Sequence, residues 1–235
     1  MCINLLTFTM YENHYGDENS LTSEKMVSLC WMPVFGFERH TLNRHLTLKQ
    51  YRNLDLTLFA VMLIISESLI VNAATRWFPD QLYTVSVSAA IVSIVLMRWG
   101  PWAAVHAVLG GLVYCFWAGG TPKQYLIYMV GNLFSLLALF MFRLFGKERI
   151  RENVLLILLF ALCTQLFMQM GRACVSFVMG APFSTGFNFI TTDALSGLFT
   201  MVIVWIASRL DGVFEDQISY LLRVQKENEE EKGGF

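Results

Sequence analysis

Apolar segments long enough to enter a lipid bilayer dominate this chain and restrict its fold more than any other feature. Six of them follow one another after residue 50, at about 55–75, 82–98, 101–118, 123–144, 153–178 and 187–208. A backbone in hydrocarbon must satisfy its hydrogen bonds within the segment, so each stretch is expected to be a helix. The sequence therefore predicts an all-α polytopic membrane protein, with a bundle of six transmembrane helices over residues 51–210.

Turn-forming residues separate the apolar segments and support this division. The breaks read WFPDQ, RWGPW, AGGTPKQ, GKERIREN and GAPFSTGFN. Because Pro and Gly end helices, each break is expected to be a connection. The second and third segments are short for about 30 Å of hydrocarbon, so they should be buried among the others or tilt little.

The composition agrees with a membrane protein. Hydrophobic residues make up 55% of the 235 positions and charged residues only 15%, whereas about a quarter of a soluble domain is charged. The mean hydropathy is +0.51. A net charge of -1 gives no electrostatic indication of a nucleic-acid partner, and none is expected.

Lysine and arginine are distributed unevenly over the predicted connections. With six spans, fourteen of them fall on the side that holds both tails, and three, Arg76, Lys123 and Arg172, fall on the other. Cytoplasmic loops carry the excess of these residues, so both termini are predicted to be cytoplasmic.

Both tails differ from the membrane domain. Residues 1–50 form a polar extension, either disordered or interfacial, and its apolar patch Met26–Phe37 is too short to span. Residues 211–235 predict an amphipathic helix followed by a charged tail. The residues that form one helical stripe there are Val213, Phe214, Ile218, Leu221, Leu222 and Gln225.

An acidic residue, Glu67, stands near the middle of the first apolar segment. An ionised carboxylate at that depth costs several kcal/mol unless it is paired or hydrated, so it should face the bundle. Ser68, Asn72 and Arg76 recur at four-residue spacing and continue a polar stripe towards the outer face. Glu67 either pairs with a neighbouring helix and holds the bundle together, or lines the floor of a cavity.

Further polar and aromatic residues gather at the outer ends of other segments. Because the inner halves are nearly all apolar, a cavity here should open outward and be closed below. Aromatic rings there suit a flat ring system, and Arg76, Lys123 and Arg172 suit a carboxylate or phosphate. The predicted substrate-binding residues are Glu67, Asn72, Arg76, Trp77, Tyr83, Trp117, Gln124, Tyr128, Asn132, Gln169, Arg172, Asn188 and Asp193.

Small residues recur every four positions on the second and third segments. Such faces let helices approach closely, either within this chain or against another membrane protein. The residues predicted to dock a partner are Ser86, Ala90, Ala103, Ala107 and Gly111.

Motifs for metal binding and for catalysis are absent from the sequence. His106 has no second ligand at metal-binding spacing, and there is no P-loop, nucleophile elbow or HExxH. We therefore expect no metal, no cofactor and no enzymatic activity.

The layout resembles the S component of an energy-coupling factor (ECF) transporter. The resemblance covers about 50–235 and depends on LDLTLFAVMLIISESLIVNAATRWF, GGTPKQYLIYMVGNLFS and NFITTDALSGLFTMVIVWIASRLDG. It implies capture of a vitamin or related micronutrient, with cobalamin slightly favoured, near the outer surface of a prokaryotic plasma membrane. It also implies three partners, a transmembrane coupling protein and two cytoplasmic ATPases. Many members carry an AxxxA face on the first helix, but here Ala60 is followed four residues later by Ile64.

Other functions remain open from the sequence. One alternative is a self-sufficient carrier. Another is a membrane-embedded enzyme that uses Glu67, His106, Arg172 or Asp193, which must then lie within hydrogen-bonding reach of one another. A structural or assembly protein without a ligand is the last.

Overall fold

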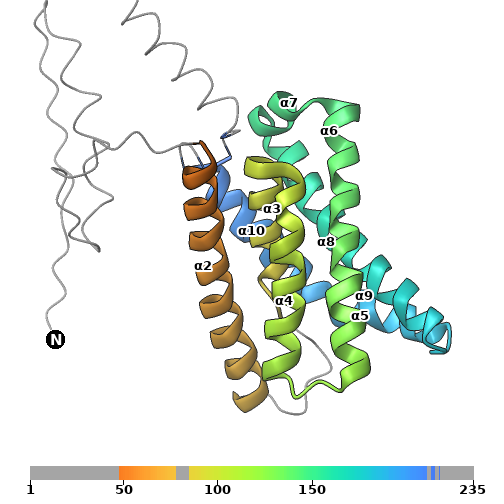
Figure 1. Cartoon of the computed structure of the whole chain (residues 1–235). Coiled ribbons are helices and arrows are strands. Elements are labelled where there is room, and N and C mark those ends of the chain that lie inside the picture. The colour runs from red at the N-terminus through yellow and green to blue at the C-terminus, as the bar shows by residue number, and fades with distance from the viewer. Residues whose placement is uncertain (1–47, 78–84, 211–212, 215–216, 218–235) are drawn as a thin grey trace, which may run out of the picture. The chain divides into compact units, whose positions relative to one another are not determined.

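A computed structural model describes residues 48–77, 85–210, 213, 214 and 217, all within the compact unit Leu46–Phe235. These residues form helices and contain no strand (Figure 1). Residues 1–47 of the extension predicted over 1–50, Tyr83 and most of the predicted C-terminal helix lie outside them, whereas residues 48–50 already belong to the first helix. The helices are α2 (Leu48–Trp77), α3 (Ser88–Trp99), η1 (Gly100–Trp102), α4 (Ala103–Trp117), α5 (Pro122–Asn132), η2 (Leu133–Ala138), α6 (Leu139–Phe145), α7 (Lys147–Glu152), α8 (Val154–Val178), α9 (Ser184–Thr192) and α10 (Ala194–Ser208).

Four helical runs in the described part are long and apolar enough to cross a membrane, and a fifth if α9 and α10 count as one bent span. The four runs are Lys49–Trp77, Ser88–Trp117, Pro122–Phe145 and Val154–Val178. The outer face of α2 exposes a continuous stripe that includes Leu54, Leu58, Ile65 and Leu69. Soluble monomers rarely expose apolar patches of this extent, so the bundle is compatible with a multi-pass membrane protein.

The run Ser88–Trp117 reverses direction at Gly100, within the predicted break RWGPW. Gly100 has φ +57°, a conformation that favours glycine. The two halves pack together, since a Cβ on Gly110 would lie 2.6 Å from the Cβ of Ser88. Helices α3 and α4 are therefore an antiparallel pair, and α3, at 12 residues, is only about 18 Å long.

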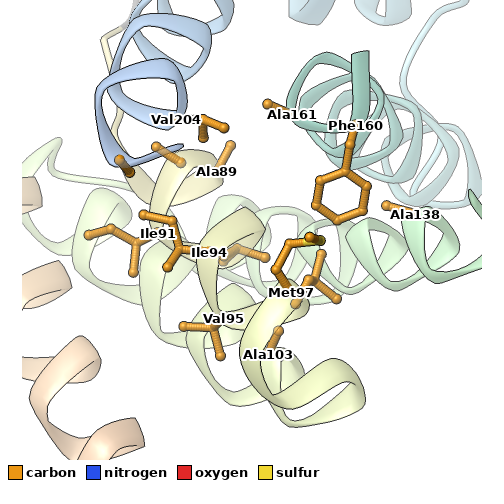
Figure 2. Packing of buried hydrophobic residues seen from close by; sticks show 14 of the residues in the cluster. Ala89, Ile91, Ile94, Val95, Met97, Ala103, Ala138, Phe160, Ala161 and Val204 are labelled. Carbon is orange, nitrogen blue, oxygen red and sulfur yellow. The ribbon is translucent and has the colours of Figure 1, made fainter. Parts of the chain in front are cut away.

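Helix α3 lies at the centre of the bundle, and all 12 of its residues are buried. Its Ile94 and Met97 belong to one core cluster with Phe160 of α8 and Val204 of α10 (Figure 2). A segment that is short for the hydrocarbon thickness is thus buried among the other helices, which is one of the two outcomes that its length predicts. Trp99 at the end of this helix is 1% exposed, and its indole Nε1 donates to Asp55 at 2.6 Å.

A buried ion pair ties α2 to α3 at the end of the bundle where η1 turns, which we name the Arg98 end. The Nε and Nη2 of Arg98 each donate to Asp55 at 2.9 Å, and Nη1 donates to the carbonyl of Val213 at 3.1 Å. The start of α2 and the chain beyond α10 therefore meet at one end. The prediction of a nearly all-apolar inner half missed Asp55, and it treated Arg98 only as a loop charge.

Glycines set the closest helix crossings and so determine which polar residues meet. A Cβ on Gly131 would lie 2.6 Å from the backbone nitrogen of Arg172. A Cβ on Gly171 would collide with the carbonyl of Gly131 and the side chain of Phe134. Helices α5 and α8 can therefore approach backbone to backbone, as in other small-residue crossings.

The five residues predicted to dock a partner are buried inside this chain, and that prediction is corrected here. Ser86 is 7% exposed, and Ala90, Ala103 and Ala107 are 0% exposed. A Cβ on Gly111 would lie 2.8 Å from the backbone of Tyr128. These small side chains allow close packing between α3, α4 and α5, which leaves none of them for a partner.

Candidate functional site

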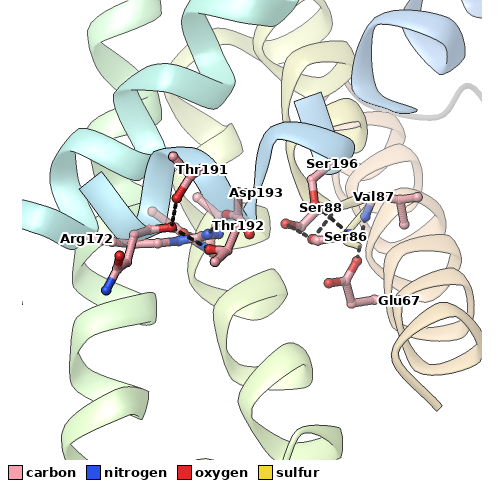
Figure 3. A network of polar contacts seen from close by, with 12 residues as sticks. Glu67, Ser86, Val87, Ser88, Arg172, Thr191, Thr192, Asp193 and Ser196 are labelled. Atoms are coloured by element: carbon pink, nitrogen blue, oxygen red, sulfur yellow. Dashed lines mark hydrogen bonds and ion pairs between the residues drawn. The ribbon is translucent and has the colours of Figure 1, made fainter. Parts of the chain in front are cut away.

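Arg172 is the centre of a buried polar network between α5, α8 and α10 (Figure 3). Its side chain is 4% exposed and pairs with Asp193, to which Nη1 donates. Its Nε donates to the Oδ1 of Asn132 at 2.9 Å. A buried charge is tolerated only where it is paired and its hydrogen bonds are made, and this guanidinium has both.

Asn132 connects this network to a third helix. It is 0% exposed and is the last residue of α5, directly after the Gly131 crossing. Its Oδ1 accepts from Arg172, and its Nδ2 donates to the carbonyl of Ala107 on α4 at 3.0 Å. The amide thus uses its acceptor and its donor at once, and it orients Arg172 relative to α4.

Asp193 enters the network because the helix breaks beside it. The sequence predicts one segment over 187–208, but α9 ends at Thr192 and α10 begins at Ala194, with a bend of 42°. Asp193 is 3% exposed, and it also bonds the side chain of Gln169, one turn before Arg172 on α8. The break thus places the Asp193 carboxylate against two side chains of α8, Gln169 and Arg172. A continuous helix facing lipid would leave this carboxylate exposed.

Aromatic rings cover one side of the Arg172 network. The guanidinium carbon lies 4.4 Å from the ring centroid of Tyr128. Tyr114 stacks on Tyr128 with centroids 4.8 Å apart and planes at 19°. Phe189 meets Tyr128 edge to face at 6.1 Å. Arg172 and Tyr114 therefore use the two faces of the Tyr128 ring, while Tyr114 and Phe189 remain partly exposed.

Glu67 belongs to a second cluster, at the start of α3 and α10. Its Oε2 accepts from the backbone amide of Val87 at 2.9 Å. The amide of Ser86 donates to the Oγ of Ser196 at 3.0 Å, and the hydroxyls of Ser86 and Ser88 are 2.8 Å apart. Residues 85–87 are not helical, and such backbone at membrane depth must be satisfied by protein groups. Glu67 and Ser196 supply those groups from α2 and α10.

The two clusters flank the first turn of α10 (Figure 3). Asp193 belongs to the Arg172 network, and Ser196, three residues later, belongs to the Glu67 cluster. Trp117 of α4 donates from Nε1 to the Oγ of Ser68 at 2.7 Å, so the end of α4 meets α2 beside Glu67. Charged, amide and hydroxyl groups thus lie on both sides of this turn, while the Trp117–Ser68 bond is exposed.

The structure brings together some of the predicted substrate-binding residues. Tyr128, Asn132, Gln169, Arg172 and Asp193 form the network, and Glu67 lies in the adjacent cluster. The following lie outside both: Asn72, partly buried on α2; Arg76, Trp77, Gln124 and Asn188, all exposed; and Trp117, bonded to Ser68.

Gln124 has a local role that the sequence prediction overlooked. It forms a capping box with Thr121 at the start of α5, accepting from the Thr121 backbone amide at 2.7 Å. The signature, Thr followed three residues later by Gln, is visible in TPKQ.

The sequence prediction missed Ser88 and Ser196, and it assigned Ser86 to docking. Serine in an apolar segment is common and gives little signal by itself. The sequence did contain one signal. Glu67 is a carboxylate in a helix that precedes a serine-rich connection, and the backbone amides of such a connection need acceptors.

His106 lies at a different level from Glu67. Its Nε2 is 3.0 Å from the carbonyl oxygen of Leu56, and Leu56 precedes Glu67 by eleven residues on α2, about 16 Å along the helix. The structure therefore does not bring His106 and Glu67 together as an acid–base pair. Among the residues described, no three His, Cys, Asp or Glu side chains group as a metal site.

Comparison with known proteins assigns no family to this arrangement. No family model, no curated protein and no solved structure matches the chain.

Proposed function

We propose that the protein captures a small solute as the substrate-binding subunit of an ECF-type importer. The observation that carries the proposal is the Arg172–Asp193–Asn132 network, held between the helices of a largely apolar bundle. Ionisable groups at membrane depth are costly and mark functional sites. A network that also carries partly exposed aromatic rings has the components of a binding site.

The proposal includes six crossings with both termini in the cytoplasm. In this topology α2 and α8 each cross once, and the α3–α4 hairpin crosses twice. The run from α5 to α6 makes one crossing, and α9 with α10 makes another. Support comes from the Arg98 end, where the start of α2 and residues after α10 meet. Helix α7 lies at this same end (Figure 1) and its sequence contains Lys147, Arg149 and Arg151. An excess of positive residues is typical of the cytoplasmic side.

Delivery of the solute would depend on partners, since this sequence holds no ATP-binding motif. Those partners are a transmembrane coupling protein and two cytoplasmic ATPases. The former docking assignment is excluded by burial, so a coupling protein must use another face. Vitamins and related micronutrients are the proposed cargo, brought from the outer side of a prokaryotic plasma membrane.

Native mass spectrometry of detergent-purified protein tests the proposal directly. We expect a stoichiometric bound mass of vitamin size. Arg172→Lys should lose that mass, because an ammonium cannot donate to Asn132 and Asp193 in the fixed geometry of a guanidinium. Glu148→Gln, an exposed change on α7, should keep it. A ligand-free mass in the parent, with no thermal shift across a vitamin panel, contradicts the proposal.

A further inference from the structure

The contacts of Arg172 argue against an anionic substrate, an inference that rests on the proposed capture function. Its Nη1, its Nε and its planar face already engage Asp193, Asn132 and Tyr128. The other two cations predicted to take a carboxylate or phosphate, Arg76 and Lys123, are exposed and lie outside the network. Of these three cations, the one that is buried is therefore already paired with a carboxylate.

Two buried oxygen atoms point to the opposite chemistry. Glu67 Oε1 and Gln169 Oε1 accept no hydrogen bond from any described residue, and their side chains are 0% and 3% exposed. The orientation of the Gln169 amide follows from its bond to Asp193. A carboxylate paired with Arg172 only accepts, so the amide NH₂ must face Asp193 and Oε1 must point elsewhere. A buried acceptor that receives no hydrogen bond lowers the stability of the folded protein.

The carboxyl groups outnumber the cations around the start of α10. Arg172 is one cation, and Asp193 is its partner, which leaves Glu67. The Oε2 of Glu67 accepts from the Val87 amide, the Ser86 hydroxyl also bonds this carboxyl group, and no ion pair joins Glu67 to a described residue. A ligand that brings N–H donors and a positive charge supplies both of the missing interactions.

We propose that the substrate is an aromatic nitrogen base, a planar ring that bears an amino or ammonium group. Its N–H groups donate to Glu67 Oε1 and Gln169 Oε1. Because Arg172 and Tyr114 take the two faces of Tyr128, the ring of the substrate packs instead against Tyr114 and Phe189, which are partly exposed. The Trp117–Ser68 bond keeps the Tyr114 end of α4 beside Glu67.

The test compares probes that share a ring and differ in the charged group. Tryptamine is paired with indole-3-propionate, and 3-(aminomethyl)pyridine with nicotinate. Thermal shift and calorimetric titration are measured on the full chain in detergent. We expect both amines to raise the thermal midpoint and neither carboxylate to do so.

Two variants assign the acceptors. Glu67→Gln keeps an oxygen for the Val87 amide but replaces the second acceptor by a donor, and Gln169→Met removes an acceptor at similar volume. Each should weaken amine binding at least tenfold. Glu148→Gln makes the same chemical change on exposed α7 and should leave binding unchanged.

Each outcome separates the substrate class from the capture function. Binding of the carboxylates in preference to the amines overturns the nitrogen-base assignment and leaves capture standing. Amine binding that survives both variants, each folded by size-exclusion chromatography, overturns the role of the two acceptors. Absence of binding by all four probes, together with a ligand-free native mass, overturns the capture function and this inference together.

Discussion

At the scale of single residues, the described part of the chain holds two shielded ion pairs, Arg172–Asp193 and Arg98–Asp55, and a separate buried carboxyl group, Glu67. Arg172–Asp193 and Arg98–Asp55 lie in different parts of the bundle, and both are largely shielded from solvent. Removing one partner of a buried pair leaves an uncompensated charge and costs about 3–5 kcal/mol, whereas replacing both is often tolerated. Each ion pair is therefore expected to support the stability of the fold only while both of its members are present.

Arg172→Met and Asp193→Leu should each lower the thermal midpoint strongly, because each leaves the other charge unpaired. The double variant should lose less than the sum of the two single losses, with a coupling of about 0.5–3 kcal/mol. Thermal unfolding in detergent, followed by tryptophan fluorescence, measures all four proteins. Strict additivity would show that the two side chains do not stabilise each other.

Asp55→Asn tests the second pair at the Arg98 end. The change keeps the size of the side chain but removes the charge that accepts from Arg98 and Trp99. We expect a loss of about 1–3 kcal/mol, smaller than for complete removal of a partner, because the Asn oxygen can still accept and Arg98 keeps its bond to the Val213 carbonyl. Glu148→Gln is the matched control, since its pair with Arg151 is exposed, and such surface pairs contribute about 0–1 kcal/mol. Equal losses in both variants would contradict a special role for Asp55.

The sequence reveals which residues are unusual more readily than which of them meet. Glu67, Arg172 and Asp193 stand out because charge is rare in apolar segments, and each is buried in polar contacts. The bond between Arg172 and Asn132 could not be inferred, because it depends on how α5 crosses α8. Asp55 was missed because it lies near the start of its segment, where a charge is unremarkable.

At the scale of helices, glycine and proline explain what was predictable. The breaks at RWGPW and AGGTPKQ carry both residues and separate helices in the structure. The break at Asp193 has neither residue beside it, since its neighbours are Thr192 and Ala194, so the sequence predicted one continuous segment. The crossing at Gly131 and Gly171 was equally hidden, because glycine in a membrane helix does not disclose its partner.

Gly171→Ala tests whether this crossing positions the site. The added methyl group would collide with the Gly131 carbonyl and the Phe134 side chain, and overpacking of this kind costs about 1–3 kcal/mol. Because Arg172 is the next residue, binding should weaken as well. Gly197→Ala is the control, since its nearest neighbour would be Gln165 Cγ at 4.0 Å. Thermal midpoint and ligand retention should fall in the first variant and hold in the second.

At the scale of the whole molecule, the proposed topology predicts which ends are reachable from outside the cell. Lys123 opens α5 at the end opposite to α7, where Lys147 lies (Figure 1). In a background with all five cysteines replaced by serine, Lys123→Cys should react with an impermeant maleimide on intact cells. Lys147→Cys should react only after permeabilisation, because positive residues stay on the cytoplasmic side. The reverse labelling pattern would show that the topology is inverted. The Arg172 network would then lie in the cytoplasmic half, where a solute from outside has no direct access.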